Sequence, residues 1–225
     1  MKQRVLEPEL LDSLPHDDPG AIQSRADLLK VNWIMGNHAW MLRMLRHERK
    51  RGERVCELGA GDGALSRKII QSGLCAPQDF HAVDLAPQPS DWPARASWHH
   101  GDLFANELPE CEILIANLFL HHFSADQLVE LGKHLPSCTR LIFAAEPARY
   151  RVHQITGGLI ARALRMHYVT RYDMRVSIRA GFRADELPRA LALPTSWSWS
   201  GWCTMFGANR VVMRRDTSLA QREKS

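Results

Sequence analysis

The stretch Val55-Cys56-Glu57-Leu58-Gly59-Ala60-Gly61-Asp62-Gly63-Ala64-Leu65-Ser66 constrains the fold of this chain most strongly. In it, a short apolar run that carries a carboxylate meets three alternate glycines and passes into helix-compatible sequence. Glycine lets the backbone approach a ligand closely and adopt φ values that a Cβ disfavours, and the N–H groups that open the next helix offer unpaired donors. The pattern predicts a strand-to-helix turn that holds a nucleotide-type cofactor.

Two classes of cofactor fit such a turn. Residues 59–64 satisfy the dinucleotide pattern G-x-G-x-x-G/A, and Asp84 lies where a ribose-binding acid should fall. Glu57, however, occupies a position that is usually apolar in a dinucleotide site, whereas a cationic ligand favours a carboxylate there. A second acidic turn, 101–103, follows the strand-like residues 97–100. The last two features favour a cationic nucleotide over a dinucleotide.

With these motifs, the chain resembles the class I S-adenosylmethionine-dependent methyltransferases of the bacterial small-molecule type over residues 50–215. The resemblance implies S-adenosylmethionine as the cofactor, with Asp84 on the ribose hydroxyls and Asp102 facing the adenine amino group. Asn32 and Gly36 are similar to an Asn-x-x-x-Gly element that closes over the methionine end, although a helix break explains them equally well. The implied cofactor-binding residues are Glu57, Gly59, Ala60, Gly61, Gly63, Asp84, Leu85, Asp102, Leu103, Asn117, Asn32 and Gly36.

Composition narrows the class of protein. A chain of 225 residues with 45% hydrophobic residues can build one α/β domain. The start has no apolar signal core and the most apolar stretch, 113–119, is too short to span a bilayer, so we expect a cytoplasmic protein without a membrane span. The five cysteines show no C-x-x-C spacing, and no disulfide framework or metal site is expected. The net charge of +4 is spread without a basic stripe, which disfavours nucleic acid as a partner.

Strand-like and helix-like segments alternate along the chain. This order predicts an α/β fold with a Rossmann-like, doubly wound, mostly parallel seven-stranded sheet and helices on both faces. The expected strands are 54–58, 80–84, 96–100, 111–116, 140–145, 197–204 and 208–214, and the expected helices include 64–72, 124–135 and 185–192. In the resembled family the last two strands form an antiparallel hairpin.

We expect a single domain over residues 1–215. Its parts are an N-terminal helical lid (1–50) that breaks near Gly36-Asn37, a cofactor-binding core (51–149), a substrate-side insertion (150–182), and a C-terminal helix and hairpin (183–215), followed by a flexible tail (216–225).

Ligands of doubly wound sheets bind beyond the carboxyl ends of the strands, which directs attention to residues 117–123, 146–149 and the insertion. Residues 117–120 read Asn-Leu-Phe-Leu and not the Asn/Asp-Pro-Pro-aromatic tetrad of enzymes that methylate base amines. His121 and His122 are the main catalytic candidates, because a neutral imidazole can take the proton of a phenol or enol. Packing beneath the next helix is the alternative role of this pair.

The insertion carries a mixture of aromatic and polar residues that suits an aromatic or polyketide-like acceptor, and ordinary helix packing would also account for it. Tyr172-Asp173 lies where relatives would have His-Asp, so Asp173 is expected to orient and Tyr172 is a weaker acid/base candidate. We therefore expect methyl transfer to a small acceptor, at an oxygen of a phenolic, quinol or polyketide-type compound. C-methylation of a quinone-type ring, non-catalytic cofactor binding and dinucleotide binding are the alternatives. A homodimer is compatible with these expectations.

Overall fold

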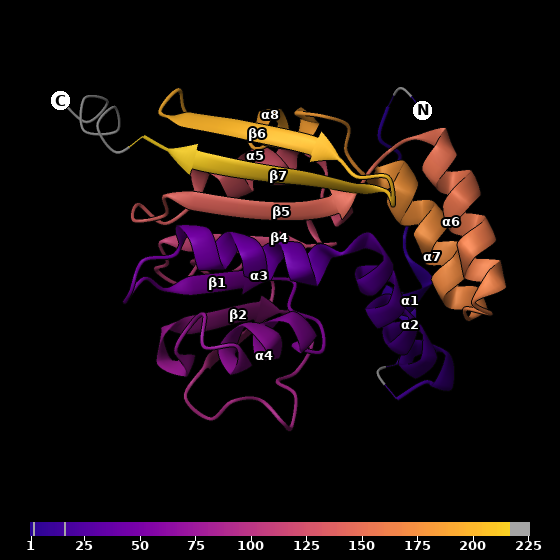
Figure 1. Ribbon diagram of the computed structural model, residues 1–225, viewed down its shortest axis with the longest axis horizontal. Coiled ribbons are helices and arrows are strands. Elements are labelled where there is room, and N and C mark those ends of the chain that lie inside the picture. Colours follow the sequence, from indigo (N-terminus) through magenta and orange to yellow (C-terminus); the bar gives the residue numbers. More distant parts are fainter. Residues whose placement is uncertain (2, 16, 217–225) are drawn as a thin grey trace.

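The computed structural model describes residues 1, 3–15 and 17–216 and shows a central sheet with helices on both faces and at one end (Figure 1). The tail expected at 216–225 lies, apart from Asp216, outside the described residues. The helices are α1 (Leu10–Ser13), α2 (Pro19–Met35), α3 (Asn37–Glu48), α4 (Ala64–Gln71), α5 (Ala125–Lys133), α6 (Arg151–Ala163), α7 (Tyr168–Ala180) and α8 (Glu186–Ala190). The strands are β1 (Val55–Leu58), β2 (Phe80–Asp84), β3 (Ser97–His100), β4 (Ile113–Asn117), β5 (Leu141–Pro147), β6 (Trp197–Cys203) and β7 (Ala208–Arg215).

The sheet has the strand order β3-β2-β1-β4-β5-β7-β6. The first five strands pair in parallel, and β7 pairs antiparallel with both β5 and β6. Every residue of β1 and β5 is buried, as the apolar composition of strands covered on both faces requires. The predicted α/β class, the mostly parallel seven-stranded sheet and the C-terminal antiparallel hairpin are confirmed.

Each face of the sheet is covered by its own layer of helices. On one face, Met41 of α3 and Ile69 of α4 are fully buried against strand residues such as Phe80 and Phe143. On the other face, Leu128 of α5 and Leu187 of α8 pack in a second core cluster. Ser124 and Gln127 form the capping box that starts α5. The sheet is therefore held rigidly between two apolar layers, and its carboxyl edge is left for a ligand.

The N-terminal part divides at Gly36, which adopts φ +65° and ends α2. A left-handed residue at this position stops one helix and lets the next start in a new direction, as glycine commonly does. Because α3 packs on the face of the sheet, it belongs to the core, and of the expected lid over residues 1–50 only the part before Gly36 lies beside the carboxyl edge (Figure 1).

The insertion folds into α6 and α7, which lie side by side at the end of the sheet where β5 finishes (Figure 1). α7 also contacts α1 and α2, so the two N-terminal helices meet a helix from a distant part of the sequence over this edge. No helix in the described part of the chain is long and apolar enough to cross a membrane.

Candidate active site

A cavity of about 1040 Å³ lies beyond the carboxyl ends of β1, β2 and β4. Its walls come from the glycine turn after β1, the acidic turns after β2 and β3, the segment after β4, the N-terminal helices α1 and α2, and the α6–α7 pair. Strand order reverses between β1 and β4, the point at which doubly wound sheets open a crevice for ligands. The chain therefore places its main cavity where the sequence predicts the cofactor.

Two glycines explain the shape of the turn after β1. Gly59 has φ +67°, and a Cβ there would lie 2.1 Å from Cδ2 of Phe119, so only glycine fits. Gly61 has φ +59°, lines the cavity, and a Cβ there would meet no atom within 4 Å. The backbone of Gly61 thus faces the open space that a ligand would occupy. At Gly59 a side chain is excluded for a different reason, because the ring of Phe119 packs directly on the backbone.

Asp84 is held in a fixed orientation at the end of β2. Its Oδ2 accepts a hydrogen bond of 2.7 Å from the Gly61 N–H, and its Oδ1 accepts one of 2.7 Å from the Ala86 N–H. Burial raises the pKa of this carboxyl. Asp102 lies in the neighbouring turn, where its Oδ1 accepts from the Phe104 N–H at 2.9 Å. Both carboxylates line the cavity, so the structure brings the two predicted acids to one wall.

The remaining predicted cofactor residues fall into two groups. Those that line the cavity are Glu57, Gly59, Ala60, Leu85, Leu103, Asn32 and Asn117. Gly63 and Gly36 do not line it, so their assignment to the cofactor stays a prediction without support from the cavity. Gly63 precedes α4 with its open side against Trp92, and Gly36 faces the side chain of Arg210, so each glycine serves the backbone at a helix boundary.

Glu57 is a buried carboxyl at the floor of the cavity, with 2% of its surface exposed. Burial, together with the charges of the nearby Asp84 and Asp62, raises its pKa to about 8, although the hydrogen bond that the hydroxyl of Ser66 donates opposes the shift. The group is therefore protonated at neutral pH unless a cation approaches it. A cationic ligand in the cavity would favour its ionised form.

Asn117 joins β4 to the N-terminal helices. Its Nδ2 donates a hydrogen bond of 2.9 Å to Oδ1 of Asn32 on α2. Oδ1 of Asn117 is buried and has no hydrogen-bond partner among the described residues. Because buried polar atoms are nearly always paired, this unpaired acceptor in a cavity-lining residue is a candidate contact for a ligand.

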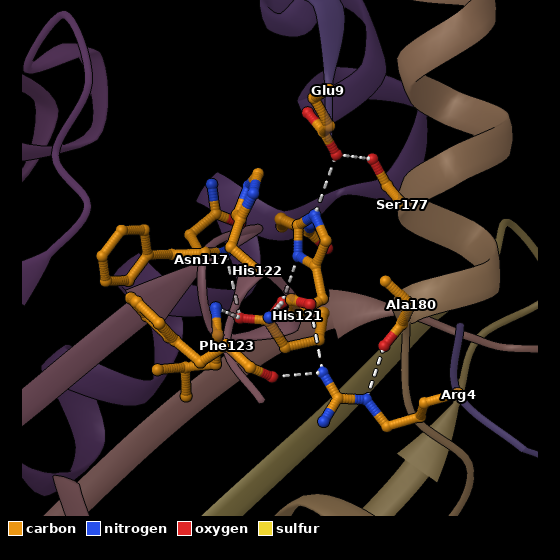
Figure 2. A network of polar contacts seen from close by, with 12 residues as sticks. Arg4, Glu9, Asn117, His121, His122, Phe123, Ser177 and Ala180 are labelled. Carbon is orange, nitrogen blue, oxygen red and sulfur yellow. Dashed lines mark hydrogen bonds and ion pairs between the residues drawn. The ribbon is translucent and has the colours of Figure 1, made fainter. Parts of the chain in front are cut away.

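His121 is bound on both sides of its ring. Nδ1 donates to Oε2 of Glu146 at 2.8 Å, and Nε2 lies 3.4 Å from Oε1 of Glu9 (Figure 2). Burial alone would lower the pKa of His121, but the hydrogen bonds to Glu146 and Glu9 raise it to about 9. A protonated imidazole with both nitrogens occupied is not available as a general base, which leaves His122 as the candidate of the pair. That one of the two histidines is the base stays a prediction.

His122 has the opposite character. Its ring lies beside that of His121, with the ring centroids 4.3 Å apart, and it lines the cavity. Burial and the charge of His121 lower its pKa. Its Nδ1 lies 3.5 Å from Oδ2 of Asp12. His122 is consequently neutral at neutral pH, and of the two histidines it is the one able to accept a proton.

Asp173 and Tyr172, the two candidates from the insertion, lie in surroundings that differ from those expected of acid/base residues. Asp173 is buried and lines the cavity, but its Oδ1 and Oδ2 accept hydrogen bonds from the backbone N–H groups of Leu10 (2.7 Å) and Leu11 (3.1 Å). It therefore anchors the start of α1. Tyr172 is 39% exposed and is not part of the cavity wall. Its position on α7 exposes Tyr172 to solvent and gives no support to an acid/base role, which stays a prediction.

The carboxylates that control the histidines were not assigned this role from the sequence, although residues 146–149 were among the expected ligand-facing segments. Glu146, at the end of β5, is fully buried and accepts from the backbone N–H groups of Phe119, Leu120 and His121. Glu9 belongs to the N-terminal segment, where the hydroxyl of Ser177 also donates to it (Figure 2). Only the position of Glu146 at a strand end was a signal in the sequence.

The N-terminal segment is tied down beside this cluster. Arg4 donates to the carbonyl oxygens of His121 (3.0 Å), Phe123 (2.9 Å) and Ala180 (2.7 Å) (Figure 2). Ligand atoms of Glu9, His121 and His122 lie within 4.8 Å of one another, which is close enough for the three residues to hold a metal ion, a grouping that the sequence analysis did not anticipate. In the structure Glu9 instead serves as the partner of protonated His121.

No protein-family model and no curated protein sequence matches this chain. Its structure, however, is similar to many solved ones. The plantazolicin methyltransferase BpumL, in complex with a triazolic desmethylPZN analog and SAH, aligns with a TM-score of 0.69 and 10% identity over 92% of this chain and 93% of that one. The pyocyanin biosynthetic protein PhzM aligns with a TM-score of 0.61 and 14% identity over 92% and 62% of the two chains.

Human N-acetylserotonin methyltransferase in complex with SAM aligns with a TM-score of 0.54 and 16% identity, over 92% of this chain and 61% of that one. At such low identity the acceptors of these proteins do not carry over. What the proteins share with this chain is the architecture, over nearly all of its length. The chain has the class I methyltransferase fold.

Proposed function

We propose that this chain transfers the methyl group of S-adenosylmethionine to an oxygen of a small, largely apolar acceptor of the phenolic, quinol or polyketide type. One observation carries the proposal. A single cavity joins the glycine turn and its carboxylates at one end to the neutral His122 and an apolar wall at the other. Such a cavity can hold a nucleoside-type donor and an acceptor in contact.

The cofactor end fits a cationic nucleoside. The bare backbone of Gly61 leaves room for the ligand, and Asp84 presents an oriented carboxylate to ribose hydroxyls. Asp102 and Leu103 would hold the adenine, and the unpaired oxygen of Asn117 would accept from an ammonium group. When bound, S-adenosylmethionine supplies an electrophilic methyl group on a positively charged sulfur. The crystals of related folds with SAH or SAM support this assignment.

The sheet argues against the dinucleotide alternative. In the common dinucleotide-binding fold six parallel strands follow the order 3-2-1-4-5-6. Here the antiparallel β7 lies between β5 and β6. The buried carboxyl of Glu57 beneath the turn also suits a cation better than a pyrophosphate.

The acceptor end is lined by apolar and flexible side chains. These include Leu11, Leu28, Met166, Met174 and Ile178. Methionine adapts its shape to the ligand, and such walls suit flat or irregular apolar molecules. The lining therefore supports an aromatic or polyketide-type acceptor over a sugar or a nucleotide.

At the reacting centre the protein would align the acceptor with the methyl group and remove the proton of the acceptor hydroxyl. His122 would accept the hydroxyl proton as the oxygen–carbon bond forms and the carbon–sulfur bond breaks. His121, protonated and fixed between Glu146 and Glu9, would position His122 through the contact of their tilted rings and keep its pKa low. Glu146 also fixes the backbone of residues 119–121 on which both histidines depend.

The test combines calorimetry with S-adenosylmethionine and turnover with a panel of phenols, quinols and alkyl polyketides. His122→Gln should bind the cofactor as the wild type does and lose about 10²–10⁴-fold in turnover, with partial recovery as pH approaches the phenol pKa of about 10. The matched control is His47→Gln, an exposed histidine on α3, which should change neither quantity.

Three results would contradict the proposal. Wild-type turnover in His122→Gln removes the base, and tight NADH binding without S-adenosylmethionine binding restores the dinucleotide interpretation. Cofactor binding with no turnover across the panel would favour a non-catalytic binding protein. The position of the methyl group in the product, read by NMR, distinguishes transfer to oxygen from transfer to a ring carbon.

A further inference from the structure

α6 presents an apolar stripe to solvent. Val152, Ile155 and Leu159 expose 56%, 65% and 62% of their surface. Their spacing of three and four residues places them on one side of the helix. The opposite side, with Ala161 buried and Gly157 against Met174, packs toward α7. The helix is therefore apolar on the side that has no partner among the residues that the structure describes.

The charges beside this stripe are all positive. Arg151 and Arg162 flank it on α6, and both are exposed. Over residues 150–182 the one acidic residue is Asp173, which is buried and bound to the backbone of α1. Three more exposed arginines follow in the insertion, which brings the set to five. None of the five forms an ion pair with a described residue. They are Arg151, Arg162, Arg165, Arg171 and Arg175.

The stripe continues to the wall of the cavity. Leu159 lines the cavity, and so do Met205 and Phe206 of the β6–β7 turn. Met205 and Phe206 are also 82% and 55% exposed to solvent. The turn lies against α6, because Nε2 of His153 is 3.4 Å from Sγ of Cys203. Exposed apolar side chains therefore form part of the cavity wall, and the β6–β7 turn that carries two of them lies beside α6 (Figure 1).

The charge pattern selects among the partners that could cover this face. A second copy of the chain, joined through this face, would bring two sets of arginines into one interface with no exposed acidic residue of 150–182 to balance them, and like charges at close range repel. An anionic lipid surface complements the arginines and also receives the apolar side chains. Apolar residues combined with a basic flank are the signature of helices that lie in a membrane interface.

We propose that α6 and the β6–β7 turn dock on an anionic lipid surface, with the side chains of Leu159, Met205 and Phe206 immersed in it. An apolar acceptor dissolved in the lipid then reaches the cavity without crossing water. This delivery step rests on the proposed methyl transfer, whereas the docking itself does not. The attachment is peripheral, since no helix of the described chain spans a membrane.

The experiment is cosedimentation of the full chain with vesicles of phosphatidylglycerol and phosphatidylcholine, and with vesicles of phosphatidylcholine alone. Binding is expected to the anionic vesicles, with release when salt is raised from about 0.1 M to about 0.5 M. Arg151→Gln with Arg162→Gln should lower the partition coefficient about 25-fold, about fivefold for each arginine. Ile155→Ser should lower it by about tenfold, because its side chain no longer enters the lipid.

Matched controls lie on other faces of the molecule. Arg43→Gln with Arg46→Gln removes two exposed arginines from α3, and Ile22→Ser removes an isoleucine of α2 that is 53% exposed. Both should bind vesicles within about twofold of the wild type, as surface positions away from the contact do. Circular dichroism and cofactor calorimetry establish that each variant is folded, so loss of lipid binding is read independently of the proposed function.

Two outcomes would overturn the proposal. The first concerns the vesicles: the wild type does not bind them, or binds anionic and neutral vesicles equally, or the α6 variants bind anionic vesicles as strongly as the wild type does. The second is a wild-type dimer in sedimentation velocity that Ile155→Ser converts to a monomer, which would assign the stripe to a second copy of the chain. Failure of lipid docking with intact cofactor binding would leave the methyl-transfer proposal standing.

Discussion

The buried carboxyl of Glu57 makes the stability of this protein depend on pH in a direction unusual for an acid. Its pKa rises from 4.5 in the unfolded chain to about 8 in the folded protein, mainly through burial. The folded state therefore holds the proton more tightly. The stability that this proton contributes is fully present below pH 4.5 and is lost as pH rises through 8.

The size of the effect follows from the shift. A difference of about 3.5 pKa units at 1.36 kcal/mol each corresponds to about 5 kcal/mol of unfolding free energy, of which about 4 kcal/mol falls between pH 5 and pH 8.5. Glu57→Gln is neutral at every pH and keeps an oxygen for the Ser66 hydroxyl. The variant should match the wild type at low pH and exceed its stability at pH 8.5.

Urea unfolding of both proteins at several pH values provides the measurement. The difference between the two curves isolates Glu57, because other titrating groups, including His121, contribute equally to both. Free energies of unfolding that stay parallel from pH 5 to pH 8.5 would show that Glu57 is ionised in the folded state, and the argument for its burial as a neutral acid would fail.

Two further variants probe the cofactor end. Asp84→Asn keeps the size of the side chain and one acceptor oxygen, and should weaken S-adenosylmethionine by about 1.5–3 kcal/mol in calorimetry, the range for hydrogen bonds to a charged group; unchanged affinity in a folded variant would remove Asp84 from the site. Gly61→Val places a branched side chain in the open space of the turn, so the thermal stabilisation that the cofactor gives the wild type should disappear, and a variant that still gains it would contradict the placement.

The cofactor end was predictable because its signals are local. The glycines of residues 59–63 indicate a strand-to-helix turn. Asp84 ends a strand and Asp102 follows one. Parallel neighbouring strands finish at the same edge of a sheet, so residues at their carboxyl ends meet without further information. Gly63 and Gly36 lie at helix boundaries outside the cavity wall, and the sequence does not reveal whether a glycine serves a ligand or a helix boundary.

The acceptor end was less predictable because its chemistry depends on long-range contacts. His121 and His122 are neighbours of identical type, and only the contact of His121 with Glu146, 25 residues away, and with Glu9, 112 residues away, makes one a cation and the other neutral. In the same way Asp173 holds the start of α1 because the N-terminal segment packs on α7.

The sequence by itself determined the order of strands and helices, the glycine turn and the edge of the sheet at which a ligand binds, because period, capping and turn chemistry act between residues a few positions apart. Tertiary structure decided which histidine is neutral, where Tyr172 lies, and which face of α6 has no partner in the described part of the chain. Those properties depend on burial and on the approach of charges from distant segments, and both arise only once the chain has folded around the cavity.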